Sequence, residues 1–111
     1  MSHCSDALFI GWSKDKIGVD IEKIDRKDRK NLIILLSHIG GIINPDIYEV
    51  SQLCKDENII LLEDCAHSCW TPGAGLGGDC AVWSFQAVKT MPMGDGGMIT
   101  TDDKKLADKC R

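Results

Sequence analysis

Residues 32–62 read LIILLSHIGGIINPDIYEVSQLCKDENIILL, and they predict a strand, a helix and a second strand. The aliphatic run from Leu32 to Leu36 is typical of a strand buried on both faces of a parallel sheet. Asn44 is expected to cap the helix, with Pro45 at its first position and Asn58 at its end. A second aliphatic run, Ile59 to Leu62, follows directly and predicts the second strand.

The predicted helix carries its apolar residues on one face. Ile47, Val50 and Cys54 recur at helical spacing, with Leu53 beside them. Such a face covers a sheet, so residues 32–62 are expected to form one βαβ unit with a right-handed crossover.

The remainder of the chain continues this alternation. Ala81 to Phe85 predicts a third strand and Gly97 to Thr100 a fourth. Thr101 is expected to cap a final helix that carries Leu106, Ala107 and Cys110 on one side. The fold class is therefore α/β, with a mostly parallel sheet and flanking helices.

The first 30 residues differ in character. Two short apolar runs, Ala7 to Ile10 and Ile17 to Ile21, predict strands joined by a turn. The charged segment from Lys23 to Lys30 is interpreted as a linker or junction.

Composition limits the possible partners. The chain has 111 residues, 13 basic and 17 acidic, and a net charge of −4 without a basic stripe, which argues against nucleic acid. No apolar run approaches the roughly 20 residues of a membrane span, and the N-terminus lacks a signal pattern. A cytoplasmic location is expected, with the six cysteines reduced and mostly acting as small buried apolar residues.

Polar residues follow two of the predicted strands. The first set is Glu63-Asp64-Cys65-Ala66-His67-Ser68, and the second runs from Ser84 to Lys89, ahead of Gly94-Asp95-Gly96-Gly97. Ligands of parallel sheets collect at the carboxyl ends of strands. An acid and a lysine placed there suit pyridoxal phosphate (PLP), because the lysine forms an imine and the acid keeps the ring nitrogen protonated. On spacing alone, two exposed charged residues explain the pattern better, because most charged residues of a protein lie at its surface.

The order and spacing of these segments resemble the DegT/DnrJ/EryC1/StrS family of sugar aminotransferases over residues 31–111. The resemblance implies part of the large domain of a PLP-dependent transferase (fold type I, aspartate aminotransferase-like). It further implies transamination of a nucleotide-linked keto-sugar by a small-molecule amino donor, in a protein that is a homodimer at full length. It assigns Lys89 to the Schiff base, Asp64 to the pyridinium nitrogen, His67 to the ring hydroxyl and Ser84 to the phosphate.

Some features depart from the family pattern. Gln86 stands where many members have histidine. His38 matches a family histidine in a His-x-x-Gly pattern, but a structural histidine explains it equally well, so His38 is left outside the predicted site. The family's earlier glycine/threonine-containing helix start, its ring-stacking aromatic residue and its C-terminal small domain have no counterpart here. The chain is therefore expected to be a fragment.

A second resemblance concerns residues 1–28. Ser2-His3-Cys4 and Ile17-Gly18-Val19-Asp20-Ile21-Glu22 are similar to segments of 4′-phosphopantetheinyl transferases. It implies that Asp20 and Glu22, on one face of a strand, hold Mg²⁺ and that His3 contacts coenzyme A phosphates. Two exposed strand carboxylates are an equal alternative. The chain could thus be an inactive composite joined near residues 23–30, or a Mg²⁺-dependent phosphopantetheinyl transferase.

Of two further patterns, the first is rejected and the second is kept only as a minor alternative. Gly73-Ala74-Gly75-Leu76-Gly77-Gly78 fits the dinucleotide-binding G-x-G-x-x-G pattern, but it precedes a predicted strand and opens no helix. Cys65, His67, Cys69 and Cys80 could be drawn as a zinc site, yet their spacing is not that of usual zinc ligand pairs.

Overall fold

Alternating strands and helices fill the part of the chain that the computed structural model describes, residues 32–111. The aliphatic runs predicted as strands form strands, shifted by one residue at several ends. The elements in chain order are β1 (Ile33–Ser37), η2 (Ile39–Gly41), α1 (Ile47–Glu57), β2 (Ile60–Asp64), β3 (Cys80–Ser84), β4 (Gly97–Thr100) and α2 (Lys104–Lys109).

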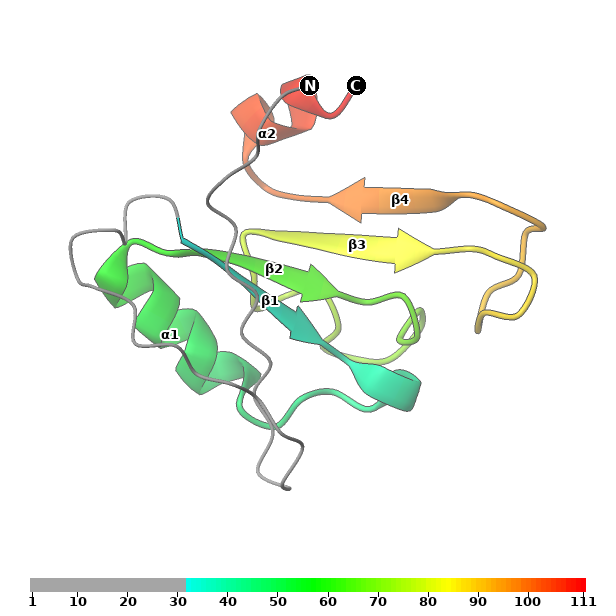
Figure 1. Cartoon of the computed structure of the whole chain (residues 1–111), viewed down its shortest axis with the longest axis horizontal. Coiled ribbons are helices and arrows are strands. Elements are labelled where there is room, and N and C mark those ends of the chain that lie inside the picture. Colours follow the sequence, from blue (N-terminus) through cyan, green and yellow to red (C-terminus); the bar gives the residue numbers. More distant parts are fainter. Residues whose placement is uncertain (1–31) are drawn as a thin grey trace.

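The strands form one sheet in the order β1-β2-β3-β4. In Figure 1 the first three arrows point the same way and β4 runs against them, in agreement with the parallel β1–β2 and β2–β3 pairs and the antiparallel β3–β4 pair. The predicted α/β class and mostly parallel sheet are confirmed. In the register of β1 and β2, Ser37 pairs with Asp64, so both strands end at the same edge of the sheet.

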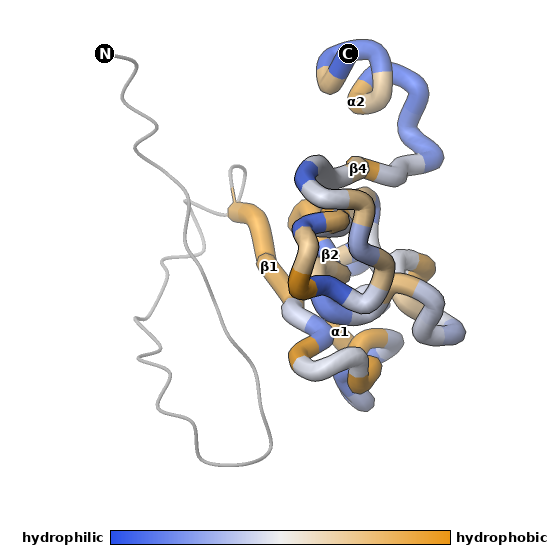
Figure 2. Tube along the Cα trace, turned by 90° about the vertical axis from the view of Figure 1, so that its right-hand side faces the viewer, coloured by the Kyte–Doolittle hydropathy of each residue, from blue (hydrophilic) through white to orange (hydrophobic). Residues whose placement is uncertain are grey.

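The core lies between one face of the sheet and α1. Its four buried members are at most 2% exposed: Leu36, Ile47, Cys54 and Leu61. Figure 2 shows that β1 is apolar along its length, which suits a strand that packs into this core. The predicted helix face of Ile47, Val50 and Cys54 is confirmed, but Leu53 is 53% exposed and does not belong to it.

Helix α1 begins later than predicted. Asp46 precedes its first residue, and the side chain of Asn44 instead accepts a hydrogen bond of 3.0 Å from the Asp46 backbone N–H. An asparagine can bond the backbone two residues on as readily as it caps a helix, and here the turn is formed. The predicted end is confirmed, because Asn58 adopts the left-handed conformation at φ 54°.

The start of α2 also differs from the prediction. Asp103 is the capping residue, and its side chain accepts hydrogen bonds from the backbone N–H groups of Lys105 and Leu106. Thr101 accepts the Asp103 N–H and donates to the carbonyl of Asp79, so it fixes the turn before the helix. The prediction that Thr101 caps this helix was therefore wrong.

The prediction that most cysteines are small buried residues is partly wrong. Cys54 and Cys65 are buried free thiols, but Cys69 and Cys80 are half-buried and Cys110, beyond the end of α2, is exposed.

Several predictions lie outside the described residues. These concern the strands at residues 7–10 and 17–21, the charged segment 23–30, and the proposed roles of His3, Asp20 and Glu22. Within residues 32–111 no helix has the length and apolarity needed to cross a membrane.

Candidate functional site

A pocket of about 310 Å³ lies where β1 and β2 end. This volume is at the lower end of the roughly 300 to 1,000 Å³ typical of small-molecule sites. Asp64, His67 and Lys89, which come from two separate segments, line it together. The other lining residues are Ser37, His38, Ile39 and Ala66. The structure therefore brings together three of the four residues that the sequence assigned to the PLP site.

The carboxylate of Asp64 is held by one hydrogen bond at each oxygen. Its Oδ2 accepts from the hydroxyl of Ser37 at 3.2 Å, and its Oδ1 accepts from the backbone N–H of Ala66 at 3.0 Å. The backbone carbonyl of Asp64 also accepts the N–H of His38 at 3.0 Å. Each carboxylate oxygen keeps further acceptor capacity, so Asp64 is both oriented and able to bind a ligand donor.

Lys89 enters the pocket from the turn that follows β3. Its backbone N–H donates to the carbonyl of Gln86 at 2.9 Å, which closes this turn. The neighbouring Thr90 hydroxyl donates to the carbonyl of His67 at 3.3 Å. The segment that carries Lys89 is thereby tied to the segment after β2.

Ser84 ends β3 opposite Gly97 and is half-buried. It does not line the pocket of Asp64, so its predicted phosphate contact stays a prediction. Gln86, at the position where many family members have histidine, is exposed.

A buried pair supports the wall of the pocket. His38 Nε2 lies 2.7 Å from Glu63 Oε2, and both side chains are fully buried. The backbone N–H of Asn44 donates to His38 Nδ1 at 3.1 Å, so Nδ1 carries no proton and Nε2–H donates to Glu63. His38, which the sequence reasoning left outside the site, lines the pocket as a neutral histidine with both ring nitrogens bonded.

The glycine-rich loop before β3 binds the same carboxylate. Gly75 donates its N–H to Glu63 Oε2 at 2.9 Å, and Gly77 and Gly78 donate theirs to Oε1 at 2.7 and 2.5 Å. The loop opens no helix. The expectation that this loop opens no helix is confirmed, and three of its amides hold an internal carboxylate.

Three buried side chains, those of His38, Glu63 and Cys65, have potential metal-ligand atoms within 4.8 Å of one another. Burial raises the pKa of the Cys65 thiol to about 11, so at neutral pH it stays protonated and is a poor ligand. Both oxygens of Glu63 already accept hydrogen bonds. Of the four residues of the zinc alternative, only Cys65 belongs to this group, so zinc gains no support.

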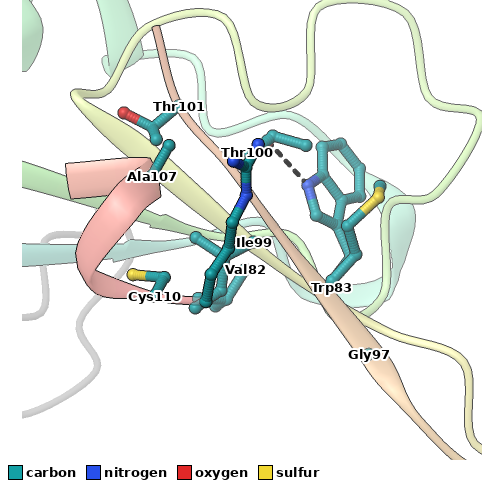
Figure 3. A pocket seen from close by; sticks show the side chains of 10 residues that line it. Val82, Trp83, Gly97, Ile99, Thr100, Thr101, Ala107 and Cys110 are labelled. Atoms are coloured by element: carbon teal, nitrogen blue, oxygen red, sulfur yellow. Dashed lines mark hydrogen bonds between the residues drawn. The ribbon is translucent and has the colours of Figure 1, made fainter. Parts of the chain in front are cut away.

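A larger pocket, of about 770 Å³, lies at the β4 edge beside α2. Figure 3 shows the Trp83 indole pointing toward Thr100, to whose hydroxyl it donates a hydrogen bond of 2.9 Å, with Ala107 and Cys110 on the helical side. None of the predicted site residues within residues 32–111 lines this pocket. The smaller pocket is therefore the candidate functional site.

Comparisons with a family model and with known proteins all point to one family of aminotransferases. The model of the DegT/DnrJ/EryC1/StrS aminotransferase family matches residues 2–111. The spore coat polysaccharide biosynthesis protein SpsC of Bacillus subtilis is 38% identical over 109 residues, which are 94% of this chain and 28% of SpsC. The dTDP-4-dehydro-2,3,6-trideoxy-D-glucose 4-aminotransferase of Saccharopolyspora spinosa is 37% identical over 82 residues, or 70% of this chain and 21% of that enzyme.

Among solved structures, NtdA from Bacillus subtilis with bound cofactor PMP superposes with a TM-score of 0.66 at 26% identity. The match covers 78% of this chain and 21% of NtdA. The fold is thus that of PLP-dependent aminotransferases, and the chain spans less than a third of the length of these relatives.

The family match starts at residue 2 and so includes the segment compared above with phosphopantetheinyl transferases. These comparisons give that second resemblance, and Mg²⁺ at Asp20 and Glu22, no support. The division of the chain into residues 1–28 and 31–111 stays a prediction.

Proposed function

The chain belongs to the DegT/DnrJ/EryC1/StrS aminotransferase family. We propose that it carries the part of a PLP site that contains the Schiff-base lysine, Lys89, for transamination of a nucleotide-linked keto-sugar. The observation that carries this proposal is the meeting of Asp64, His67 and Lys89 in one pocket at the carboxyl edge of the parallel strands. These residues come from two separate segments, and they supply three different chemical groups.

The donor set fits the cofactor. Lys89 offers the amine that would bind the aldehyde, and Asp64 offers an oriented carboxylate for the ring nitrogen. His67 would lie beside the ring hydroxyl, and Ser84 would bind the phosphate. When bound, PLP supplies an electron sink that stabilises negative charge on the carbon of the amino donor.

The protein's own groups have separate tasks in this proposal. With PLP bound, the negative charge of Asp64 would favour the protonated ring nitrogen, because opposite charges in a half-buried site stabilise each other. Lys89, once its amine is free, is the group placed to move a proton at the donor carbon. The Ser37 and Ala66 hydrogen bonds keep the carboxylate oriented while this happens.

Substrate class and partners follow from the relatives. An enzyme named for a dTDP-linked dehydro-sugar and a polysaccharide biosynthesis protein both resemble this chain, which supports a nucleotide-linked keto-sugar and a small-molecule amino donor. Since the chain covers 28% of SpsC, turnover is proposed for a protein of the relatives' length. We further propose a homodimer and a cytoplasmic location for that protein.

Borohydride trapping tests cofactor binding by the chain itself. The chain is incubated with PLP and reduced with borohydride, and mass spectrometry of its peptides is expected to find the added pyridoxyl group on Lys89. Lys89→Arg should abolish this label, and Lys105→Arg, on exposed α2, should retain it. Absence of a label on Lys89 in a chain that circular dichroism shows to be folded would contradict the proposal.

A further inference from the structure

A buried carboxylate lies immediately before Asp64 in the chain. Glu63 is 0% exposed, and it accepts hydrogen bonds from His38 Nε2 and from the backbone N–H groups of Gly75, Gly77 and Gly78. Four donors converge on its two oxygens. This arrangement requires the acceptor-only, ionised form, because a protonated carboxyl would have to give up one acceptor position.

Glu63 and Asp64 share one strand end but serve opposite faces of the sheet. Successive side chains of a strand point to opposite faces, so anchoring Glu63 on one face fixes the direction of Asp64 on the other. Glu63 follows the core residue Leu61 in the alternation of β2, which places its side chain on the α1 face. Asp64 lines the candidate pocket.

The four donors come from two segments far apart in sequence. His38 follows β1, and the three glycines belong to the loop before β3. Glu63 therefore joins the end of β1, the end of β2 and the entry to β3 at one point. His38 itself lines the pocket, so the same carboxylate fixes part of the pocket wall.

We infer that Glu63 is a positioning residue for the candidate site: its ionised carboxylate fixes the ring of His38 in the pocket wall and the strand end from which Asp64 reaches the ligand. This inference rests on the proposed function for its meaning in catalysis. Glu63 does not line the pocket, so it acts through these two neighbours.

Glu63→Gln is the direct test in the full chain. An amide has one acceptor oxygen and a donating NH₂ group, so it cannot accept four hydrogen bonds and would oppose N–H groups that now donate. The expected result is PLP affinity at least about 10-fold weaker, with Lys89 still trapped by borohydride at saturating PLP. Glu49→Gln, the same change on the exposed face of α1, should leave the affinity unchanged.

Two His38 variants provide a rescue test that does not alter Glu63. His38→Gln can keep an N–H donor for the carboxylate, whereas His38→Leu removes it and leaves Glu63 short of one partner. PLP affinity closer to that of the wild type in His38→Gln than in His38→Leu supports positioning. Equal affinity in all folded variants, including Glu63→Gln, would overturn it.

A readout without PLP separates this inference from the proposed function. Carbon-13 NMR of the Asp64 carboxyl group reports its surroundings in the ligand-free chain. We expect its chemical shift to change in Glu63→Gln and in His38→Leu, and to stay the same in Glu49→Gln. If the wild-type chain fails to bind PLP, the proposed function is wrong while this NMR comparison still decides the inference: an unchanged Asp64 signal in the folded variants contradicts it.

Discussion

The hydroxyl of Ser37 donates a hydrogen bond of 3.2 Å to Oδ2 of Asp64, and the two residues are register partners on neighbouring parallel strands. They lie at the last positions of β1 and β2, at the edge of the sheet where the candidate pocket opens. The strand register therefore supplies Asp64 with a partner that holds its carboxylate at the candidate pocket.

Ser37→Ala removes this hydrogen bond. We expect PLP to bind about 3- to 10-fold more weakly, because a single hydrogen bond contributes about 0.5 to 1.5 kcal/mol. Ser37→Thr keeps the hydroxyl and is the matched control. The affinities are measured by titrating each chain with PLP and following the visible absorption; equal affinity in the Ala and wild-type chains would show that this contact does not influence binding.

Asp64→Asn tests the charge itself, with little change in side-chain volume. Hydrogen bonds to charged groups contribute about 1.5 to 3 kcal/mol, so PLP affinity should fall about 10- to 100-fold. Trapping at Lys89 should persist at high PLP concentration, since the amine is unchanged. Asp46→Asn, on the α1 side of the chain, provides a comparison of the same chemistry away from the pocket. Wild-type affinity in Asp64→Asn would contradict the pyridinium assignment.

Elements with a strong local signal were predictable from the sequence. The aliphatic runs gave β1 and β2, and the spacing of Ile47, Val50 and Cys54 gave the buried face of α1. The predicted helix starts were wrong because Asn44 and Thr101 had two competing uses. Asn44 forms a local turn with Asp46, and Thr101 donates to the distant carbonyl of Asp79.

The sequence was sufficient to predict the chemical groups of the candidate site, but not the neighbouring residues that hold them in position. Asp64 ends β2 and Lys89 follows β3, so their meeting at one edge follows from parallel pairing. The partners of Ser37 and His38 depend on the register between β1 and β2, which no local pattern reveals. The sequence carried one usable signal, the alternation of side chains along a strand. Ser37 ends an aliphatic strand, and its side chain lies on the same face of the sheet as that of Asp64 once β1 and β2 are aligned.

Gly78→Ala is expected to destabilise the chain by about 3 kcal/mol, as overpacking against an immobile group does. A Cβ there would lie 2.8 Å from the carbonyl oxygen of Leu61, which already accepts the N–H of Asp79 and cannot withdraw. Gly40→Ala is the control, because its Cβ meets no atom within 4 Å and only its φ of 66° is unfavourable, a cost of about 1 kcal/mol. Urea unfolding measures both; an equal loss in the two variants would contradict the steric account.

Cys65 is expected to make the free energy of unfolding fall as the pH rises into the alkaline range. Burial raises the pKa of its thiol in the folded chain to about 11, above the value of 9.0 expected when unfolded. Between these values the unfolded chain releases a proton that the folded chain retains. This contribution to the free energy of unfolding is therefore complete below pH 9 and is lost as the pH rises toward 11. Between these values the free energy of unfolding falls by up to about 1.4 kcal/mol per pH unit. Cys65→Ala lacks this proton, while every other ionisable group is shared by the two chains. Urea unfolding at several pH values from 8 to 11 should thus give a steeper decline for the wild type than for Cys65→Ala, and parallel declines would show that the Cys65 pKa is not raised.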